Sequence, residues 1–201
     1  MPRADAYIRK TVERFEGAGR KRGYVPMQQG RVLGNSGVTI GTGVDLGQHS
    51  REELEQMGVP VTIIGALVSY LGLQQEAAVA KLNTCPLVLA EDAVAALDRA
   101  VIGHCITRME MRFDHTVQSL ASLPRPGFFA ERPKEVQAVL VSLAYPLGFG
   151  GFPRTYALLA GGQYAGAIAE LRNSAAWKHR YISRRREEAA LIEQAMPAGE
   201  A

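Results

Sequence analysis

A glycine-rich segment follows the first predicted helix and constrains the fold more than any other feature of this 201-residue chain. Within it, the β-branched residues Val38, Thr39 and Ile40 form a short run that is typical of a strand. Glycines, which favour tight turns, recur before and after this run at Gly23, Gly30, Gly34, Gly37, Gly41, Gly43 and Gly47. The segment therefore predicts a small β-hairpin or three-stranded sheet between residues 23 and 47.

Helical patterns occupy the rest of the chain. A first helix is expected over residues 5–16, where Ile8 and Val12 lie at helical spacing. Ser50 and Glu53 form an S-x-x-E capping box, which predicts that a new helix begins near residue 51. Further helical pieces are predicted at about 60–71, 74–83, 90–101, 104–122, 134–145, 153–160, 163–173 and 178–195.

This order of elements predicts a predominantly helical α+β fold with a small sheet near its N-terminus. We expect a single domain over residues 1–201, because the length is ordinary for one globular unit. Within that domain, the first helix and the β-region are expected to fill about 1–50. A helical lobe is expected to fill about 51–197.

The charge balance is mildly basic, with a formal net charge of +3. The strongest basic cluster comprises Lys178, His179, Arg180, Arg184, Arg185 and Arg186, and Glu187 and Glu188 follow it directly. A solvated helix face and a nucleic-acid patch are the two interpretations, and the mixed charges favour the first. We therefore expect no nucleic-acid partner.

Only Cys85 and Cys105 are present, too few for a disulfide framework and not in a metal-binding spacing. Both are expected to be small buried apolar residues. The N-terminal ten residues are charged and lack the apolar core of a secretory signal, so we expect synthesis in the cytoplasm without a Sec signal. The longest apolar run, residues 59–73, is interrupted and too short to cross a bilayer, so we expect a soluble protein without membrane insertion.

Glu16 is the most informative acidic residue. It lies four residues after Val12 and eight after Ile8, at the edge of the apolar stripe of the first helix. It also occupies the last turn, where the negative end of the helix dipole disfavours a carboxylate. Both features favour the neutral carboxyl that a general acid needs. The alternative is an ordinary surface glutamate beside a glycine that ends the helix.

The predicted hairpin offers a second acidic side chain. Alternation along residues 36–45 places Thr39 and Asp45 on one face with bare glycine backbone between them, over which a sugar ring could lie closely. Glycosidic cleavage needs an acid that protonates the leaving oxygen and, on the other side of the bond, a group that holds water or stabilises the positively charged transition state. Glu16 and Asp45 could supply these two groups, with Thr39 positioning water. Two alternatives are a phosphate-binding loop, which lacks the Gly-Lys-Ser/Thr signature, and a plain turn whose Asp caps the next element.

Two other sets of residues are weaker candidates for chemistry. His104, Cys105, Asp114 and His115 lie along one predicted helix in a spacing that matches no zinc site, so structural roles are expected. Trp177, the single tryptophan, is interpreted as a packing residue in preference to a platform for a sugar ring.

Several motifs, taken together, resemble the phage-type lysozymes. Val12-Glu13-Arg14-Phe15-Glu16-Gly17 resembles their first-helix motif, in which the Glu before Gly is the catalytic acid. Thr39-Ile40-Gly41-Thr42-Gly43 resembles their T-[IV]-G-x-G hairpin. Residues 142–148, 158–167 and 184–191 are similar to signatures of their C-terminal lobe, so the resemblance spans nearly the whole chain.

Within this superfamily, the hairpin resembles the lytic domain of pesticin and related bacterial toxins, S-G-V-T-[IV]-G-x-G-x-D. In that group the catalytic set is Glu, Thr and a following Asp, which implies Glu16, Thr39 and Asp45 here. Residues 18–38 contain no acid, unlike phage lysozymes that place their Asp there. Two departures are Val44, where phage enzymes often have His, and Pro146, where many have Asn.

The resemblance implies a lysozyme-like two-lobed fold and a glycoside hydrolase. Such an enzyme hydrolyses the β-1,4 bond between N-acetylmuramic acid and N-acetylglucosamine in peptidoglycan, without cofactor or metal. By analogy, the glycan would lie in the groove between sheet and helices, and Tyr145 would face it as a substrate-binding residue. Competing functions are a lytic transglycosylase, which uses one Glu, and a non-catalytic lysozyme-like module that binds glycan or protein.

The expected setting is that of an antibacterial effector or an endolysin acting as a monomer. Without a signal, the protein would reach the periplasm and cell wall through a phage holin, a secretion apparatus or fusion to a toxin domain. As an effector it would have an immunity protein as a partner.

Overall fold

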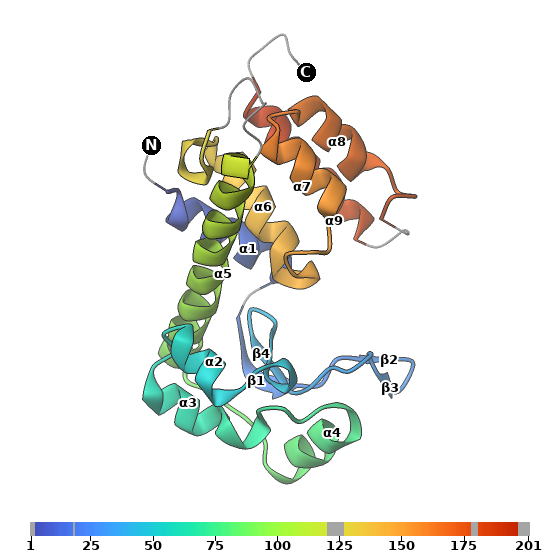
Figure 1. The fold of residues 1–201 in the computed structure, drawn as a ribbon. Helices are drawn as coiled ribbons and strands as arrows, with labels where there is room; N and C mark the ends of the chain where they lie inside the picture. Colours follow the sequence, from blue (N-terminus) through green and yellow to red (C-terminus); the bar gives the residue numbers. More distant parts are fainter. Residues whose placement is uncertain (1–2, 18, 120–126, 178–180, 197–201) are drawn as a thin grey trace. The chain divides into compact units, whose positions relative to one another are not determined.

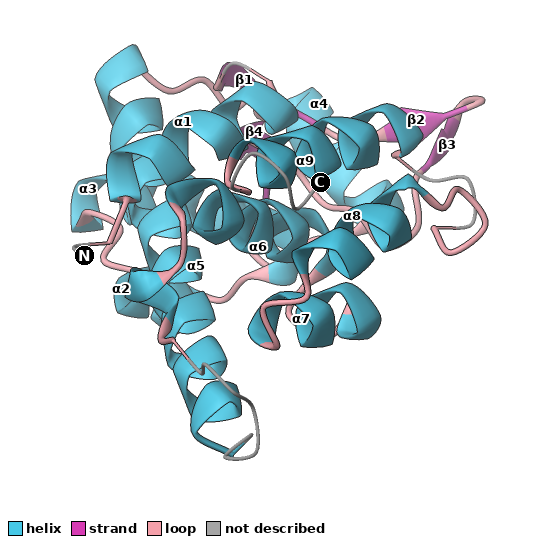
Figure 2. Cartoon of the chain, turned by 90° about the horizontal axis from the view of Figure 1, so that it is seen from above, coloured by secondary structure: helices cyan, strands magenta, loops and turns pink. Residues whose placement is uncertain are grey.

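Helices make up most of the structure, and the strands are short and confined to the N-terminal part of the sequence (Figure 1). The computed structural model describes residues 3–17, 19–119, 127–177 and 181–196. Figure 2 shows the same balance, with few strands among many helices. The predicted fold class, a predominantly helical α+β protein with a small N-terminal sheet, is confirmed.

The chain divides into two compact units. One is continuous and comprises residues 16–104, and the other combines residues 1–15 with 105–201. The internal boundary expected near residue 50 is therefore not where the structure divides, because the helices that follow residue 51 pack with the sheet. That the whole chain forms one domain stays a prediction.

The discontinuous unit, residues 1–15 with 105–201, is helical. Its elements within the described residues are α1 (Asp5–Glu16, up to Phe15), the second half of α5 (Glu91–Ser119), η3 (Phe129–Glu131), α6 (Lys134–Leu147), α7 (Pro153–Ala160), α8 (Tyr164–Arg172) and α9 (Ile182–Gln194). The most hydrophobic of these is α6, whose residues 136–144 are all buried.

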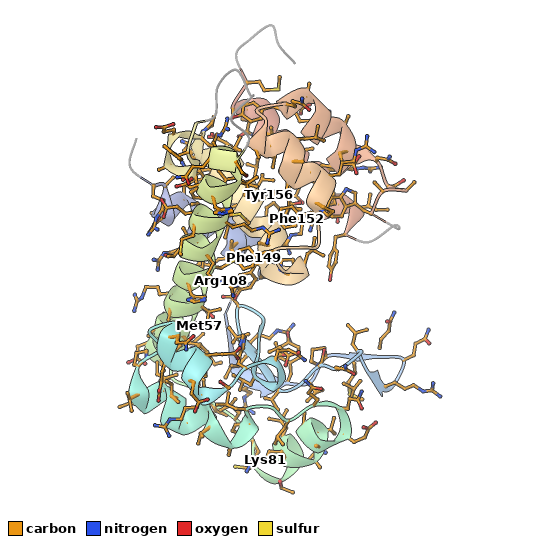
Figure 3. The ribbon with its side chains drawn as sticks, in the orientation of Figure 1. Met57, Lys81, Arg108, Phe149, Phe152 and Tyr156 are labelled. Atoms are coloured by element: carbon orange, nitrogen blue, oxygen red, sulfur yellow. The ribbon has the colours of Figure 1, made fainter. Side chains whose placement is uncertain are left out.

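Aromatic rings join α5 to α7 in this unit, and Figure 3 labels Tyr156 of α7 and Arg108 of α5. The Phe113 ring meets those of Phe129 and Tyr156 edge-on, with centroids 5.9 and 6.1 Å apart. The Arg108 guanidinium lies 4.9 Å from the centre of the Phe149 ring, which follows α6. Edge-on ring pairs and cation–π contacts add to the stabilisation from buried area.

The continuous unit, residues 16–104, contains the sheet. Strands β1 (Arg20–Tyr24), β4 (Thr39–Gly41) and β5 (Val44–Asp45) form an antiparallel sheet in the order β1-β4-β5, and β2 (Met27–Gln28) pairs separately with β3 (Arg31–Val32). Of the two predicted arrangements, a hairpin or a three-stranded sheet over residues 23–47, the structure has the three-stranded sheet, which begins earlier, at Arg20. The additional two-stranded ribbon was not predicted.

Short helices cover the remainder of this unit. They are η1 (Leu46–Gln48), α2 (Arg51–Gln56), α3 (Val61–Leu67), η2 (Val68–Tyr70), α4 (Gln75–Thr84) and the first half of α5. The capping box predicted at Ser50 and Glu53 is present, with both of its reciprocal hydrogen bonds. It satisfies two backbone N–H groups and begins α2 at the expected residue.

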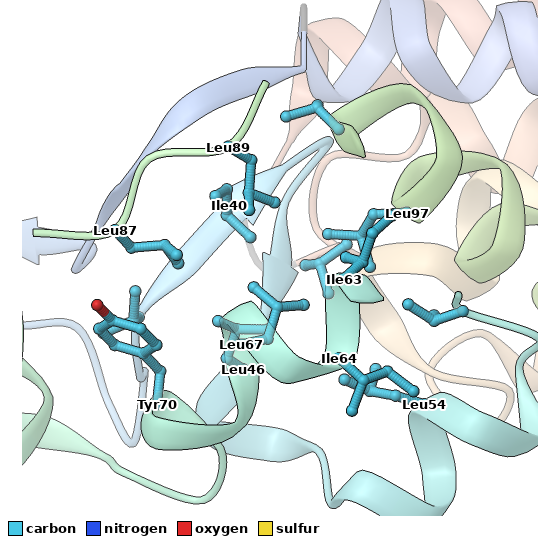
Figure 4. Close-up of a cluster of buried hydrophobic side chains, with 14 of the residues drawn as sticks. Ile40, Leu46, Leu54, Ile63, Ile64, Leu67, Tyr70, Leu87, Leu89 and Leu97 are labelled. Carbon is cyan, nitrogen blue, oxygen red and sulfur yellow. The ribbon is translucent and has the colours of Figure 1, made fainter. Parts of the chain in front are cut away.

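The apolar core of this unit gathers side chains from the sheet, the short helices and α5 (Figure 4). Ile40 of β4, Leu67 of α3 and Leu97 of α5 are each fully buried. Because Val38, Ile40 and Val44 are all buried, one face of the β4–β5 hairpin is apolar, as the alternation predicted.

The prediction of two helices over 90–101 and 104–122 is wrong, because α5 is continuous from Glu91 to Ser119. Gly103 lies at the expected break, where glycine costs about 1 kcal/mol relative to alanine. The flanking Ile102 and Ile106 are fully buried, and their packing outweighs that cost. The expected end at residue 122, and the expected start of the last helix at 178, lie outside the described residues.

The prediction of a solvated basic face is wrong for Arg184 and Arg185, and neither side chain forms an exposed nucleic-acid patch. Only 8% and 1% of these residues is exposed, and both contact the fully buried Glu188. Ser142 of α6 completes the cluster by donating to Glu188 at 2.6 Å. The three charged residues are neighbours on α9, and the sequence shows the pairs, but their burial depends on contact with Ser142 of α6, more than 40 residues away, which a local pattern does not contain. Lys178, His179 and Arg180 lie outside the described residues.

The two cysteines differ in environment. Cys85 is exposed and Cys105 is only partly buried, so the expectation that both are buried is wrong for Cys85 and met only in part by Cys105. Burial still raises the pKa of the Cys105 thiol to about 12. Both are free thiols. No helix among the described ranges combines the length and the apolar character needed to cross a bilayer.

Candidate active site

Glu16 is the last residue of α1 and is partly buried. Ile8 and Val12 on the preceding turns are fully buried, which confirms the apolar stripe at whose edge Glu16 lies. Its Oε2 atom lies 3.7 Å from the position that a β-carbon on Gly43 would occupy. The carboxyl of Glu16 therefore lies beside the turn of the β4–β5 hairpin.

The turn itself depends on glycine at two positions. Gly41 and Gly43 have φ angles of +61° and +87°, in the left-handed region that disfavours other residues. A β-carbon on Gly41 would also collide with the carboxylate of Asp98. The turn therefore exposes bare backbone next to Glu16, and Gly43 itself is exposed.

Asp98 of α5 holds this turn and was missed by sequence reasoning. Its Oδ1 accepts the backbone N–H of Thr42 at 2.8 Å, and its Oδ2 accepts the Thr42 hydroxyl at 2.6 Å. Burial raises the pKa of the Asp98 carboxyl, and the two bonds from Thr42 oppose that shift. One signal could have found it, since Asp98 stands between Val94 and Ile102 on the apolar stripe of the helix, where an acid needs a partner.

Thr39 and Asp45 lie directly opposite each other on β4 and β5, as predicted for one face of the hairpin. The Oδ1 atom of Asp45 accepts the backbone N–H groups of Gly37 and Gly47, at 2.9 and 3.0 Å. Asp45 thus caps η1, the structural alternative recognised in the sequence. These two hydrogen bonds orient the carboxylate of Asp45, and neither of them involves its second oxygen, Oδ2.

Thr39 is buried, with 4% of its surface exposed, and its hydroxyl lies 3.4 Å from the carbonyl oxygen of Gly37. The structure therefore brings Glu16, Thr39 and Asp45 into the same compact unit, around one hairpin. Tyr145 lies on α6 and belongs to the other unit. Its contact with substrate stays a prediction.

The weaker candidates have structural contacts. Asp114 accepts the backbone N–H of Phe129 at 2.7 Å, which confirms a structural role for that carboxylate. The Trp177 indole donates to the carbonyl oxygen of Glu170 at 3.0 Å and packs under the Arg185 guanidinium. Across the part of the chain that the structure describes, no three His, Cys, Asp or Glu side chains converge as a metal site.

Comparison with known families agrees with this geometry. A family model described as "Pesticin: Bacterial toxin homologue of phage lysozyme, C-term" matches residues 8–157, well over half of the chain. The matched segment contains Glu16, the β4–β5 hairpin and Asp98. No curated protein gives a significant match. The resemblance noted in the motifs is thereby confirmed, and the chain belongs to the pesticin family of bacterial toxins homologous to phage lysozyme.

Proposed function

We propose that this protein is a lysozyme-type N-acetylmuramidase that hydrolyses the β-1,4 bond between N-acetylmuramic acid and N-acetylglucosamine in peptidoglycan. One observation carries the proposal. The carboxyl of Glu16 lies against the glycine turn of a hairpin whose two strands carry Thr39 and Asp45 opposite each other. Membership of a family homologous to phage lysozyme supports the same chemistry.

In the proposed reaction, protonated Glu16 donates its hydrogen to the glycosidic oxygen as the bond to the anomeric carbon breaks. The bare backbone at Gly43 allows the sugar to approach that carboxyl closely. Asp45 stabilises the positive charge that develops on the sugar, and its orientation is already set by Gly37 and Gly47. Water, positioned with the help of the Thr39 hydroxyl, adds to the anomeric carbon and yields a reducing end, and the proton that this water loses restores, directly or through solvent, the one that Glu16 donated.

The direct test compares Glu16→Gln with Glu13→Gln, an exposed glutamate on the same helix. Loss of the general acid is expected to lower turnover about 100- to 10,000-fold, because that is the usual contribution of such a proton transfer. Glu13→Gln is expected to leave turnover unchanged. The measurement is release of reducing ends from purified peptidoglycan, with mass spectrometry of the products.

The products also decide between the competing functions. Reducing muramyl ends are expected, and anhydro-muramyl ends would show instead a lytic transglycosylase. A wild-type protein that binds peptidoglycan and releases nothing, with Glu16→Gln behaving identically, would show a non-catalytic module and overturn the proposal.

We also propose that the protein acts in the periplasm as an antibacterial effector or endolysin. The toxin character of the family supports this setting. Wild-type protein directed to the periplasm of a test bacterium is expected to lyse the cells, and Glu16→Gln protein is not. If periplasmic wild-type protein that is active in vitro proved harmless without any immunity protein, the toxin setting would be abandoned.

A further inference from the structure

Asp98 lies against two parts of the candidate site, the Gly41–Gly43 turn and the segment that follows Glu16. It lies on α5, 56 residues away in sequence from its partner Thr42, and it is 6% exposed. Both of its oxygens accept hydrogen bonds from this one residue, from the backbone N–H and from the side-chain hydroxyl. Thr42 is the central residue of the turn between Gly41 and Gly43, so the turn cannot shift without breaking these bonds.

The same carboxylate also contacts the chain that carries Glu16. A β-carbon on Gly19, three residues after Glu16, would lie 2.8 Å from Asp98 Oδ2 and 2.9 Å from a methyl group of Val94. Real β-carbons essentially never approach other atoms so closely, so backbone packs directly on the carboxylate there. Asp98 is therefore enclosed between the segment that follows Glu16 and the turn that faces Glu16.

An uncharged side chain would be enough to fill the buried position of Asp98 and pack against the turn. Asp98 forms no ion pair within the described residues, and burial of a carboxylate without a cation is costly. A carboxylate is, however, the side chain that can accept from an N–H and an O–H at once, one on each oxygen. The two bonds fix the orientation of the turn as well as its position.

We propose that Asp98 is a positioning residue, which sets the position of the Gly41–Gly43 turn relative to the carboxyl of Glu16 and so keeps Glu16 aligned with Thr39 and Asp45. This inference rests on the proposed muramidase function. The acid acts through Thr42 and takes no part in bond breaking.

The same helix provides a matched control. Asp114 also accepts the backbone N–H of a distant residue, Phe129, at 2.7 Å, close to the 2.8 Å of the bond from Thr42 to Asp98. It lies in the other compact unit. Asp98→Ala and Asp114→Ala each remove an acidic acceptor of a backbone N–H from α5, but only the first removes a contact with the turn.

The kinetic experiment measures kcat and KM of both variants on purified peptidoglycan, at a temperature where circular dichroism shows each to be folded. Misplacement of a reacting group by about 1 Å costs on the order of 100-fold, so Asp98→Ala is expected to lower kcat about 10- to 100-fold with a smaller change in KM. Asp114→Ala is expected to keep the wild-type kcat. Equal kcat values for Asp98→Ala and Asp114→Ala would overturn the proposal.

Variants of Thr42 test the same contact and can be used if Asp98→Ala does not fold. Thr42→Val removes the bond to Oδ2 and keeps the backbone N–H, whereas Thr42→Ser keeps both donors. We expect Thr42→Val to lower kcat and Thr42→Ser to restore it. If Thr42→Val has the kcat of the wild type, the side-chain bond does not position the site.

A spectroscopic measurement separates failure of this inference from failure of the proposed function. The ¹³C chemical shift of the Glu16 side-chain carboxyl, recorded at one pH, is expected to move in Thr42→Val and Asp98→Ala and not in Asp114→Ala. This readout needs no substrate. An inactive wild type with this pattern of shifts would refute the muramidase and keep the positioning role, whereas unmoved shifts would refute the positioning role alone.

Discussion

Each compact unit buries a carboxylate, Asp98 in one and Glu188 in the other, and the two differ in the charge of the groups that bind them. Asp98, in the unit of residues 16–104, accepts hydrogen bonds from the uncharged donors of Thr42 and, among the described residues, from no cation. Glu188, in the other unit, contacts Arg185 at 2.5 Å, Arg184 at 3.2 Å and the Ser142 hydroxyl at 2.6 Å. Burial raises the pKa of both carboxyls, and the cations that oppose the shift are present only around Glu188.

This difference predicts how much stability the protein loses when each carboxylate is removed. Around Glu188, loss of the acid leaves two guanidinium groups buried without their carboxylate, which is more costly than loss of a neutral hydrogen bond. Around Asp98, the donors are neutral, so an uncharged acceptor can replace part of the interaction. We therefore expect removal of the buried acid to cost more stability in the helical unit than in the sheet-containing unit, where Asp98 accepts from the turn at Thr42.

The largest effect is expected for Glu188→Ala. Removing one member of a buried ion cluster typically lowers the free energy of unfolding by about 3–5 kcal/mol, since the remaining charges stay desolvated. Chemical denaturation monitored by circular dichroism measures the change. A loss of less than about 1 kcal/mol, the size typical of an exposed pair, would show that the cluster contributes little and would break the comparison.

A smaller loss is expected for Gly41→Ala in the turn held by Asp98. The left-handed backbone alone costs about 1–2 kcal/mol for alanine, and the new methyl group must displace the Asp98 carboxylate as well. Gly58→Ala provides the control, because Gly58 has a φ of +79° and open space around it. Gly41→Ala should lower the free energy of unfolding more than Gly58→Ala, and equal losses would mean that Asp98 does not restrain the turn.

The third prediction concerns pH and Asp98→Asn. Because burial raises the folded-state pKa of Asp98, the native protein binds this proton more tightly than the unfolded chain does. The stability that wild type gains over Asp98→Asn is therefore greatest at pH values below the ordinary pKa of aspartate. It is lost as pH rises through the raised pKa of Asp98.

Urea denaturation of both proteins across that pH range measures this difference in the free energy of unfolding. The wild type should become less stable relative to Asp98→Asn with rising pH. A difference that grows with rising pH would contradict the direction of the shift.

The smallest effect is expected at the surface ion pair between Arg14 and Glu187, whose side chains are about half exposed and 3.0 Å apart. Exposed pairs contribute about 0–1 kcal/mol and are screened by salt. Glu187→Ala, next in sequence to Glu188, should therefore change the free energy of unfolding by less than about 1 kcal/mol. A loss as large as that of Glu188→Ala would remove the distinction between buried and exposed acids on α9.

Local patterns predicted the parts of this protein that short stretches of chain determine. The apolar spacing of Ile8 and Val12 predicted α1 and placed Glu16 at the edge of its buried stripe. The capping box at Ser50 was also predicted correctly. The same holds for the hairpin that places Thr39 opposite Asp45. In each case the interacting residues lie within a few positions of one another, so that helix periodicity, capping or strand alternation determines the outcome.

Only the tertiary structure decided the features that join distant residues. It made α5 continuous through Gly103, because the neighbouring side chains pack into the core, and it buried Arg184 and Arg185 around Glu188. It also brought Asp98 to Thr42 across 56 residues and so completed the candidate site. These features depend on desolvation and packing between segments far apart in sequence. A local window around Asp98 does not contain Thr42, and one around Arg184, Arg185 and Glu188 does not contain Ser142 of α6.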